Sequence, residues 1–80
     1  MIKIYSKVGC EQCKLAKDCM RRNNIDFESI DLSKKENREA RKYYRNLGIK
    51  TLPVITNDEE NWILPEWDED MFLILIGTHG

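Results

Sequence analysis

The sequence has no apolar run long enough to cross a membrane. Its longest run, Met71 to Ile76, is far shorter than the about 20 residues that a membrane-spanning helix needs. The first residues also lack the basic, apolar and small-residue succession of a secretory signal. We therefore expect a cytoplasmic protein without a membrane partner, and its 80 residues are enough for a single domain spanning 1–80.

Cysteine and histidine are too few for a disulfide framework or an ordinary structural zinc site. The chain has three cysteines and one histidine, and Cys10 and Cys13 are too close in sequence to join distant segments. A four-ligand zinc site would also need Cys19 and His79. On a helix, Cys19 lies about 600° around the axis from Cys13 and so points away from the pair. We predict no metal, and we interpret Cys19 as a small buried apolar residue and His79 as inert.

Lysine and arginine are absent after residue 50. Residues 1–50 carry all 13 basic residues and seven acids, which gives a charge of +6, whereas residues 51–80 carry seven acids and have a charge of −7. The net charge of −1 therefore hides two regions of opposite sign. Such a field orients the encounter with a partner and weakens with salt.

The first thirty residues predict a strand, a helix and a second strand. Residues 1–5 alternate apolar and polar side chains, which is typical of a strand. Residues 11–23 predict a helix whose inward face is formed by Leu15, Ala16, Cys19 and Met20. Residues 25–30 predict the next strand, and a helix between two strands favours a parallel pair with a right-handed crossover.

The remaining residues predict a helix, two strands and a last helix. Ser33 to Glu36 fits the S-x-x-E capping box and would start a helix with the apolar residues Ala40, Tyr43, Tyr44 and Leu47 and the C-terminal cap Gly48. Pro53 bars a central ladder position, so the next strand should comprise residues 54–56. Residues 61–64 would return antiparallel, and acids at 68–70 suit the first turn of a helix through residue 76. The predicted order is β-α-β-α-β-β-α, an α/β fold.

Cys10 and Cys13 form a C-x-x-C motif between the first predicted strand and the first predicted helix. In this position the motif is typical of a redox-active pair. Only a thiolate attacks a disulfide, and a helix N-terminus lowers the pKa of a thiol through its free N–H groups and its dipole. We predict that Cys10 attacks and that Cys13, three residues later, closes on Cys10 and releases the product.

The second predicted helix carries a row of basic residues that could indicate nucleic-acid binding. Glu36 and Glu39 interrupt this row, and no groove-reading motif accompanies it. We therefore interpret the row as a solvated helix face and expect no nucleic-acid partner. Trp62 is predicted to belong to the core, whereas Trp67 is predicted either to join the core or to form part of an exposed docking patch.

Three segments carry a resemblance to a known family. They are the opening from Ile4 into Cys-x-Gln-Cys at 10–13, the segment Thr51-Leu52-Pro53-Val54, and Trp62 followed by a short last helix. Over residues 2 to about 76 the chain resembles the glutaredoxin family of the thioredoxin fold, most closely its NrdH-type redoxin branch. The resemblance implies a four-stranded mixed sheet flanked by three helices, and a cis peptide bond between Leu52 and Pro53.

The resemblance also implies a substrate site and an activity. A groove for glutathione or a peptide would be bordered by Lys7, Gln12, Thr51, Leu52 and Pro53, with the Leu52 backbone pairing with that of the substrate. The family consists of thiol–disulfide oxidoreductases without a tightly bound cofactor, and we expect a monomer. The NrdH-type branch delivers electrons to ribonucleotide reductase and receives them from thioredoxin reductase, with glutathione as the alternative reductant.

The segment before the last predicted helix departs from the family. Family members carry a glycine pair or Gly-Phe there, whereas this chain has Glu66-Trp67-Asp68-Glu69-Asp70. Its bulk and negative charge should hinder the γ-glutamyl carboxylate of glutathione, so we predict a protein disulfide as the substrate. Two alternatives stay open: a glutathione-dependent glutaredoxin, and a non-catalytic thioredoxin-fold binding module or metal-binding protein.

Overall fold

The predicted order of strands and helices is confirmed by a computed structural model, which describes residues 1–77. The elements are β1 (Ile2–Ser6), α1 (Glu11–Arg22), β2 (Phe27–Asp31), the 3-10 turn η1 (Lys35–Asn37), α2 (Arg38–Asn46), β3 (Val54–Asn57), β4 (Trp62–Leu64) and α3 (Glu69–Leu75). The second strand begins two residues later than its predicted start at residue 25. His79 lies outside the described residues.

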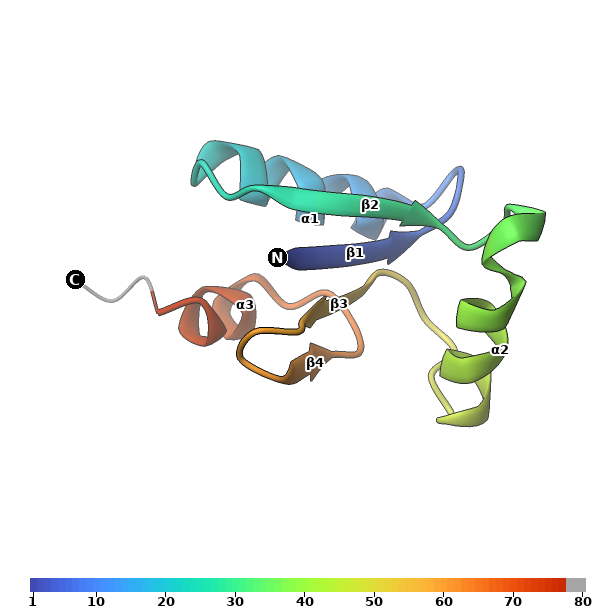
Figure 1. The fold of residues 1–80 in the computed structure, drawn as a ribbon. Coiled ribbons are helices and arrows are strands. Elements are labelled where there is room, and N and C mark those ends of the chain that lie inside the picture. Colours follow the sequence, from blue (N-terminus) through green and yellow to red (C-terminus); the bar gives the residue numbers. More distant parts are fainter. Residues whose placement is uncertain (78–80) are drawn as a thin grey trace.

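The four strands form one mixed sheet in the order β2-β1-β3-β4 (Figure 1). β1 pairs parallel with β2 and antiparallel with β3, and β3 pairs antiparallel with β4. In this register Ile4 lies between Ser29 and Ile55. Because alternate side chains of a strand point to opposite faces, Ile2, Ile4 and Ser6 are buried together on one face.

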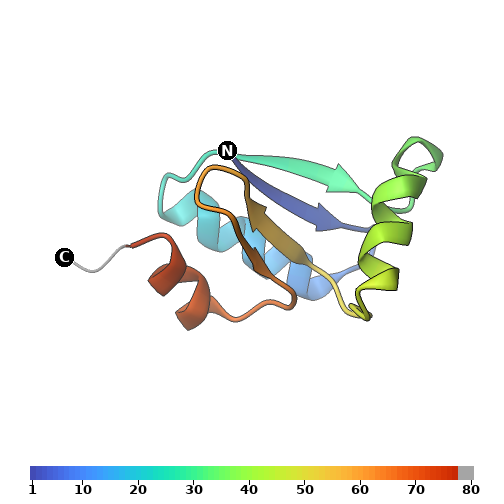
Figure 2. The same ribbon diagram turned by 60° about the horizontal axis from the view of Figure 1, so that its bottom comes forward.

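The helices α1 and α3 cover this same face of the sheet (Figure 2). The core between them and the sheet consists of Ile2, Ile4, Ala16, Cys19, Met20, Ile55, Leu64 and Phe72. Full burial of a side chain such as Phe72 contributes about 1.5–3 kcal/mol to stability. The prediction that Leu15 belongs to the inward face of α1 is wrong: half of this residue is exposed, because it lies at the flank of a narrow apolar stripe.

α2 lies across the end of the sheet to which β1 and β2 run (Figures 1 and 2). Only Tyr44 is buried in it, and its ring centroid lies 4.9 Å from that of Tyr5 on β1. Tyr43 and Leu47, predicted to be apolar contacts of this helix, are 55% and 53% exposed. That prediction is wrong because this nine-residue helix lies across the end of the sheet and buries only Tyr44.

The predicted capping box does not form. Ser33 donates its backbone N–H and its hydroxyl to Asp31 Oδ1, and these two bonds lower the pKa of the Asp31 carboxyl. The N-cap of η1 is Lys34, without a side-chain bond, and α2 starts only at Arg38. The Asp31 carboxylate at the end of β2 thus competes with the helix for the hydrogen bonds of Ser33. The chain therefore forms a turn before α2 begins.

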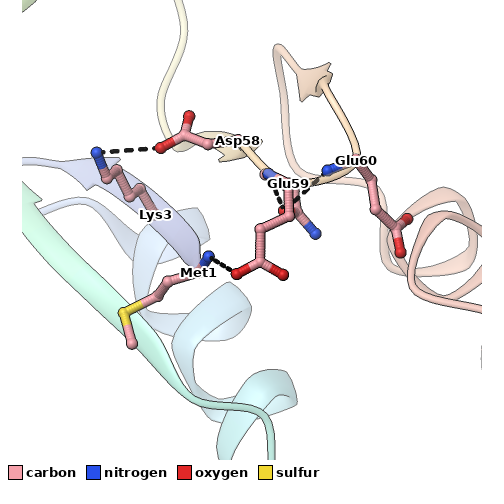
Figure 3. A network of polar contacts seen from close by, with 6 residues as sticks. Met1, Lys3, Asp58, Glu59 and Glu60 are labelled. Atoms are coloured by element: carbon pink, nitrogen blue, oxygen red, sulfur yellow. Dashed lines mark hydrogen bonds and ion pairs between the residues drawn. The ribbon is translucent and has the colours of Figure 1, made fainter.

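The turn between β3 and β4 is fastened to the start of β1 by two ion pairs (Figure 3). The amino group of Met1 lies 2.8 Å from Glu59 Oε1, and Lys3 Nζ lies 3.3 Å from Asp58 Oδ2. These contacts lower the pKa of Glu59 and raise that of Lys3. Asn57 Oδ1 accepts the backbone N–H of Glu59 and shapes the turn. Three of the four charged groups are mostly exposed and the Lys3 side chain is 32% exposed, so the network orients the turn more than it stabilises the fold.

Candidate redox-active site

The site is built where β1 turns into α1. Gly9 has φ +81°, a conformation that disfavours residues with a side chain, and this reversal delivers Cys10 to the N-cap of α1. Cys10 Sγ accepts the backbone N–H of Cys13 at 3.1 Å. The sulfur therefore occupies the place of a capping oxygen, directly at the positive end of the helix.

Cys10 and Cys13 form a disulfide, with their Cα atoms 5.2 Å apart. The two sulfurs differ in exposure, since Cys10 is partly exposed and Cys13 is only 2% exposed. A macromolecular disulfide can therefore reach Cys10 but not Cys13. This difference agrees with the predicted order, in which Cys10 attacks and Cys13 resolves.

The segment before β3 approaches the dithiol from a distant part of the chain. Leu52 places its carbonyl oxygen 3.7 Å from Cys10 Sγ, and the peptide bond between Leu52 and Pro53 is cis, as the family resemblance implied. Pro53 is fully buried next to the start of β3. The backbone of Leu52 is thus held beside the sulfur that would bond to a substrate.

The predicted groove residues do not all lie together. A cavity of about 430 Å³ is bordered by Lys7, Thr51 and Leu52, together with residues of α2 and of the segment that follows it. Gln12 and Pro53 both belong to the residues that the structure describes, but neither of them lines this cavity. Gln12 lies exposed in the first turn of α1.

Sequence reasoning missed the α2 side of this cavity. Arg41, Tyr44 and Arg45 line it, although the basic row of this helix was interpreted as a solvated face. Their spacing of i, i+3 and i+4 puts the three side chains on one side of the helix, and this spacing is the signal that could have found them. Lys50 adds a fourth cation to those of Lys7 and the two arginines.

Cys19 is separate from the redox pair and is a buried free thiol, 1% exposed, as predicted. Burial raises the pKa of the Cys19 thiol, and the neighbouring carboxylate of Glu69 raises it further. Asn23 donates its side-chain N–H to the Cys19 carbonyl at 2.8 Å. The thiol of Cys19 is therefore held protonated in the core.

Both tryptophans pack against the core through Phe72. The ring centroid of Trp62 lies 6.4 Å, and that of Trp67 5.4 Å, from that of Phe72. The prediction for Trp62 is confirmed, and the choice left open for Trp67 is decided in favour of packing on the core. The indole Nε1 of Trp62 is buried without a hydrogen-bond partner among residues 1–77.

Two features are absent from residues 1–77. This part of the chain has no group of three or more histidine, cysteine, aspartate or glutamate residues arranged to hold a metal ion. Within the same range, no helix has the length and apolar character required to span a membrane.

Proteins that combine this fold with a dithiol at a helix N-terminus exchange thiols for disulfides, and this chain is one of the thiol–disulfide oxidoreductases of the thioredoxin fold. It belongs to the glutaredoxin family, whose sequence profile matches residues 2–62. The family resemblance drawn from the sequence, and the thioredoxin fold that it implied, are therefore confirmed.

Individual relatives point to the NrdH-type branch. The chain is 34% identical over 59 residues to the glutaredoxin-like protein NrdH of Lactococcus lactis subsp. lactis, covering 74% of this chain and 79% of the relative. It is 38% identical over 60 residues to a glutaredoxin-like 8.6 kDa protein in the rubredoxin operon of Clostridium pasteurianum, covering 72% and 76%. Among solved structures, NrdH-redoxin from Escherichia coli superposes with a TM-score of 0.78 at 28% identity, over 99% of this chain and 95% of that one.

Proposed function

We propose that the chain is a monomeric, single-domain cytoplasmic electron carrier that reduces protein disulfides with Cys10 and Cys13. The observation that carries this proposal is the asymmetry of the pair: Cys10 is partly exposed and its Sγ caps α1, while Cys13 is buried one turn further on. A thiolate at the first position is favoured by the helix end, and the second sulfur stays within reach of the first.

The reaction is a two-step exchange. The Cys10 thiolate attacks one sulfur of the substrate disulfide, a mixed disulfide forms, and the other substrate sulfur leaves and takes up a proton. Cys13 then loses its proton and attacks Cys10 Sγ, which releases the second substrate thiol. Two electrons and two protons pass to the substrate, and the protein is left with the disulfide that the structure contains.

Leu52 and Pro53 hold the substrate in this proposal. The Leu52 carbonyl lies beside Cys10 Sγ, so a chain joined to that sulfur would run along the Leu52 backbone and could pair with it. Because Pro53 has no N–H, it cannot donate a hydrogen bond to the substrate. It contributes only the shape of the turn. Lys7, Gln12 and Thr51 would contact the flanks of the substrate.

A protein disulfide is the preferred acceptor, and ribonucleotide reductase is the proposed one. Support comes from the acids at 66–70, which stand where family members carry glycines, and from relatives named NrdH. The E. coli NrdH-redoxin is described as having a thioredoxin-like activity profile. We extend that profile to this chain and assign thioredoxin reductase as the electron source, with no tightly bound cofactor.

A glutathione-dependent glutaredoxin is the second candidate. The cavity beside Leu52 favours it, because Lys7 and Arg41 offer cations to a small carboxylate ligand. By the family resemblance, the acids at 66–70 would stand at the γ-glutamyl end of this ligand and oppose its carboxylate.

Two coupled assays decide between the donors. Insulin reduction is measured with NADPH and thioredoxin reductase, and in parallel with NADPH, glutathione reductase and glutathione, using Cys10→Ser as the blank. We expect turnover with thioredoxin reductase that exceeds turnover with glutathione. Turnover with glutathione alone would replace the first candidate by the second, and no turnover in either assay would leave a binding module.

A further inference from the structure

The cavity next to the dithiol is strongly cationic. Four basic side chains, those of Lys7, Arg41, Arg45 and Lys50, line its volume of about 430 Å³. Among residues 1–77, no aspartate or glutamate lines it. Cations that face a common space repel one another, so this arrangement favours a ligand with several negative charges.

Structural contacts hold part of this cationic wall in place. Arg41 is half buried and donates Nη1 to the Leu32 carbonyl at 3.3 Å, which fixes its guanidinium at the end of β2. Tyr44 is buried beside it and packs against Tyr5 with the two rings tilted at 58°. The wall is therefore preformed on one side, whereas Arg45 and Lys50 are exposed and free to adjust to a ligand.

The cavity is also continuous with the redox site through Leu52. This residue lines the cavity and places its carbonyl 3.7 Å from Cys10 Sγ. Lys7, which also lines the cavity, lies in the turn that connects β1 to Cys10. A peptide joined to Cys10 and running along Leu52 would thus enter the cavity within a few residues.

We infer that this cavity binds an acidic segment of the protein substrate, next to the cysteine that forms the mixed disulfide. The inference rests on the proposed function, and it names the recognised feature: carboxylates flanking the substrate disulfide. Arginine suits this role because its planar fork binds carboxylates with two hydrogen bonds.

Charge complementarity favours a peptide over the other anions that the cavity could take. Glutathione carries two carboxylates and an ammonium group, so it would use the four cations only in part. Nucleic acid would need a cationic track, yet Glu36 in η1 and Glu39 in α2 interrupt the basic row. An extended acidic peptide can direct its charges to the cavity alone.

The test compares two double variants that remove the same charge. Arg45→Gln/Lys50→Gln removes the two exposed positive charges that line the cavity and leaves Arg41 in place. Arg38→Gln/Lys42→Gln removes two exposed cations of α2 that do not line the cavity. Both pairs concern exposed side chains, so both variants should fold, which circular dichroism checks.

Binding is measured first, without redox chemistry. A fluorescent peptide with serine in place of cysteine and glutamates on both sides is titrated with oxidised protein at low ionic strength, and a glutamine peptide is the control. We expect the cavity variant to weaken glutamate-peptide binding about fivefold and the helix variant less than about twofold. Equal weakening in both variants would assign the effect to the overall field and overturn the inference. Tighter binding of a single-stranded oligonucleotide of matched charge, lost in the cavity variant, would assign the cavity to phosphate instead.

Turnover is measured with disulfide forms of the same two peptides and with glutathione disulfide. We expect kcat/KM for the glutamate peptide to exceed that for the glutamine peptide, and this ratio to fall about fivefold in the cavity variant and to hold in the helix variant. Reduction of both peptides at equal rates would remove the acidic preference but keep the proposed function. If neither peptide is reduced, the proposed function is wrong. The binding titration would still test whether the cavity binds an acidic peptide. A preference for glutathione disulfide that is lost in the cavity variant would show that the cavity binds glutathione, and would overturn the inference.

Discussion

Two cysteines of α1, one at its N-cap and one in its third turn, lie in opposite environments. At its N-terminus, Cys10 is partly exposed and its sulfur accepts a backbone N–H. In its third turn, Cys19 is buried, and burial together with Glu69 raises the pKa of its thiol. We therefore expect α1 to favour the thiolate of Cys10 once the disulfide is reduced, and to keep Cys19 protonated.

This comparison shows that placement, rather than cysteine content, defines the site. A thiol at the start of a helix meets unpaired N–H groups, which favour its anion. A thiol in the core meets apolar neighbours such as Ala16 and Met20, which disfavour its anion. The predictions below test this contrast, from the largest expected effect to the smallest.

Replacement of the first cysteine should have the largest effect. Cys10→Ser should lower disulfide reduction by at least about thousandfold, because a hydroxyl is a poor nucleophile towards sulfur. The fold should persist, since serine is a good N-cap and keeps the bond from the Cys13 N–H. Insulin reduction measures activity, and thermal unfolding of the reduced protein measures stability. A loss of activity accompanied by unfolding would mean that Cys10 acts through structure.

Replacement of the second cysteine should trap the intermediate. In Cys13→Ser the mixed disulfide between Cys10 and the substrate can no longer be resolved from within the protein, so it should accumulate. Non-reducing electrophoresis and mass spectrometry would detect the adduct, and Cys10→Ser is the control that should form none. An adduct on Cys10→Ser but not on Cys13→Ser would reverse the assigned order.

Replacement of the buried cysteine should affect stability and leave chemistry alone. Cys19→Ala removes one buried heavy atom and should cost about 0.5–1.5 kcal/mol of unfolding free energy. Turnover should stay within about twofold of the parent, because Cys19 lies outside the dithiol. Urea unfolding and insulin reduction measure the two quantities. A tenfold loss of turnover would give Cys19 a redox role.

The smallest effect concerns alkaline pH. The pKa of Cys19 is raised in the folded state, so above pH 9.0, its ordinary value, the unfolded chain loses this proton more readily than the folded one. The contribution of Cys19 to stability is thus complete below that pH and is lost as pH rises above it. Urea unfolding between neutral and alkaline pH should show a steeper decline in the parent than in Cys19→Ala. Parallel curves would show that Cys19 titrates alike in both states.

Local signals in the sequence were sufficient for the dithiol and most elements. The spacing of Cys10 and Cys13 before an amphipathic run placed the pair at a helix start, and acids at 68–70 placed the start of α3, where Asp68 Oδ1 caps Met71 N–H at 3.1 Å. Both signals lie within a few residues of the feature that they predict.

The failures arose from a local competitor in one case and from distant contacts in the others. Ser33 was a correct capping residue by type, yet Asp31 takes its donors once β2 has ended. Tyr43 and Leu47 have core-type side chains, but α2 sits at the end of the sheet and leaves them exposed. The α2 side of the cavity also escaped prediction. Helical spacing shows that Arg41 and Arg45 share one side of α2, but it does not show that this side borders the same cavity as the segment before Pro53.

The most direct test of the central claim is the rate at which each cysteine of the fully reduced protein reacts with iodoacetamide at neutral pH, followed by peptide mass spectrometry. Only thiolates react, so we predict alkylation of Cys10 at least about tenfold faster than of Cys13, and of Cys19 only after denaturation. Alkylation of Cys19 or Cys13 in the folded protein at a rate equal to or above that of Cys10 would contradict the account.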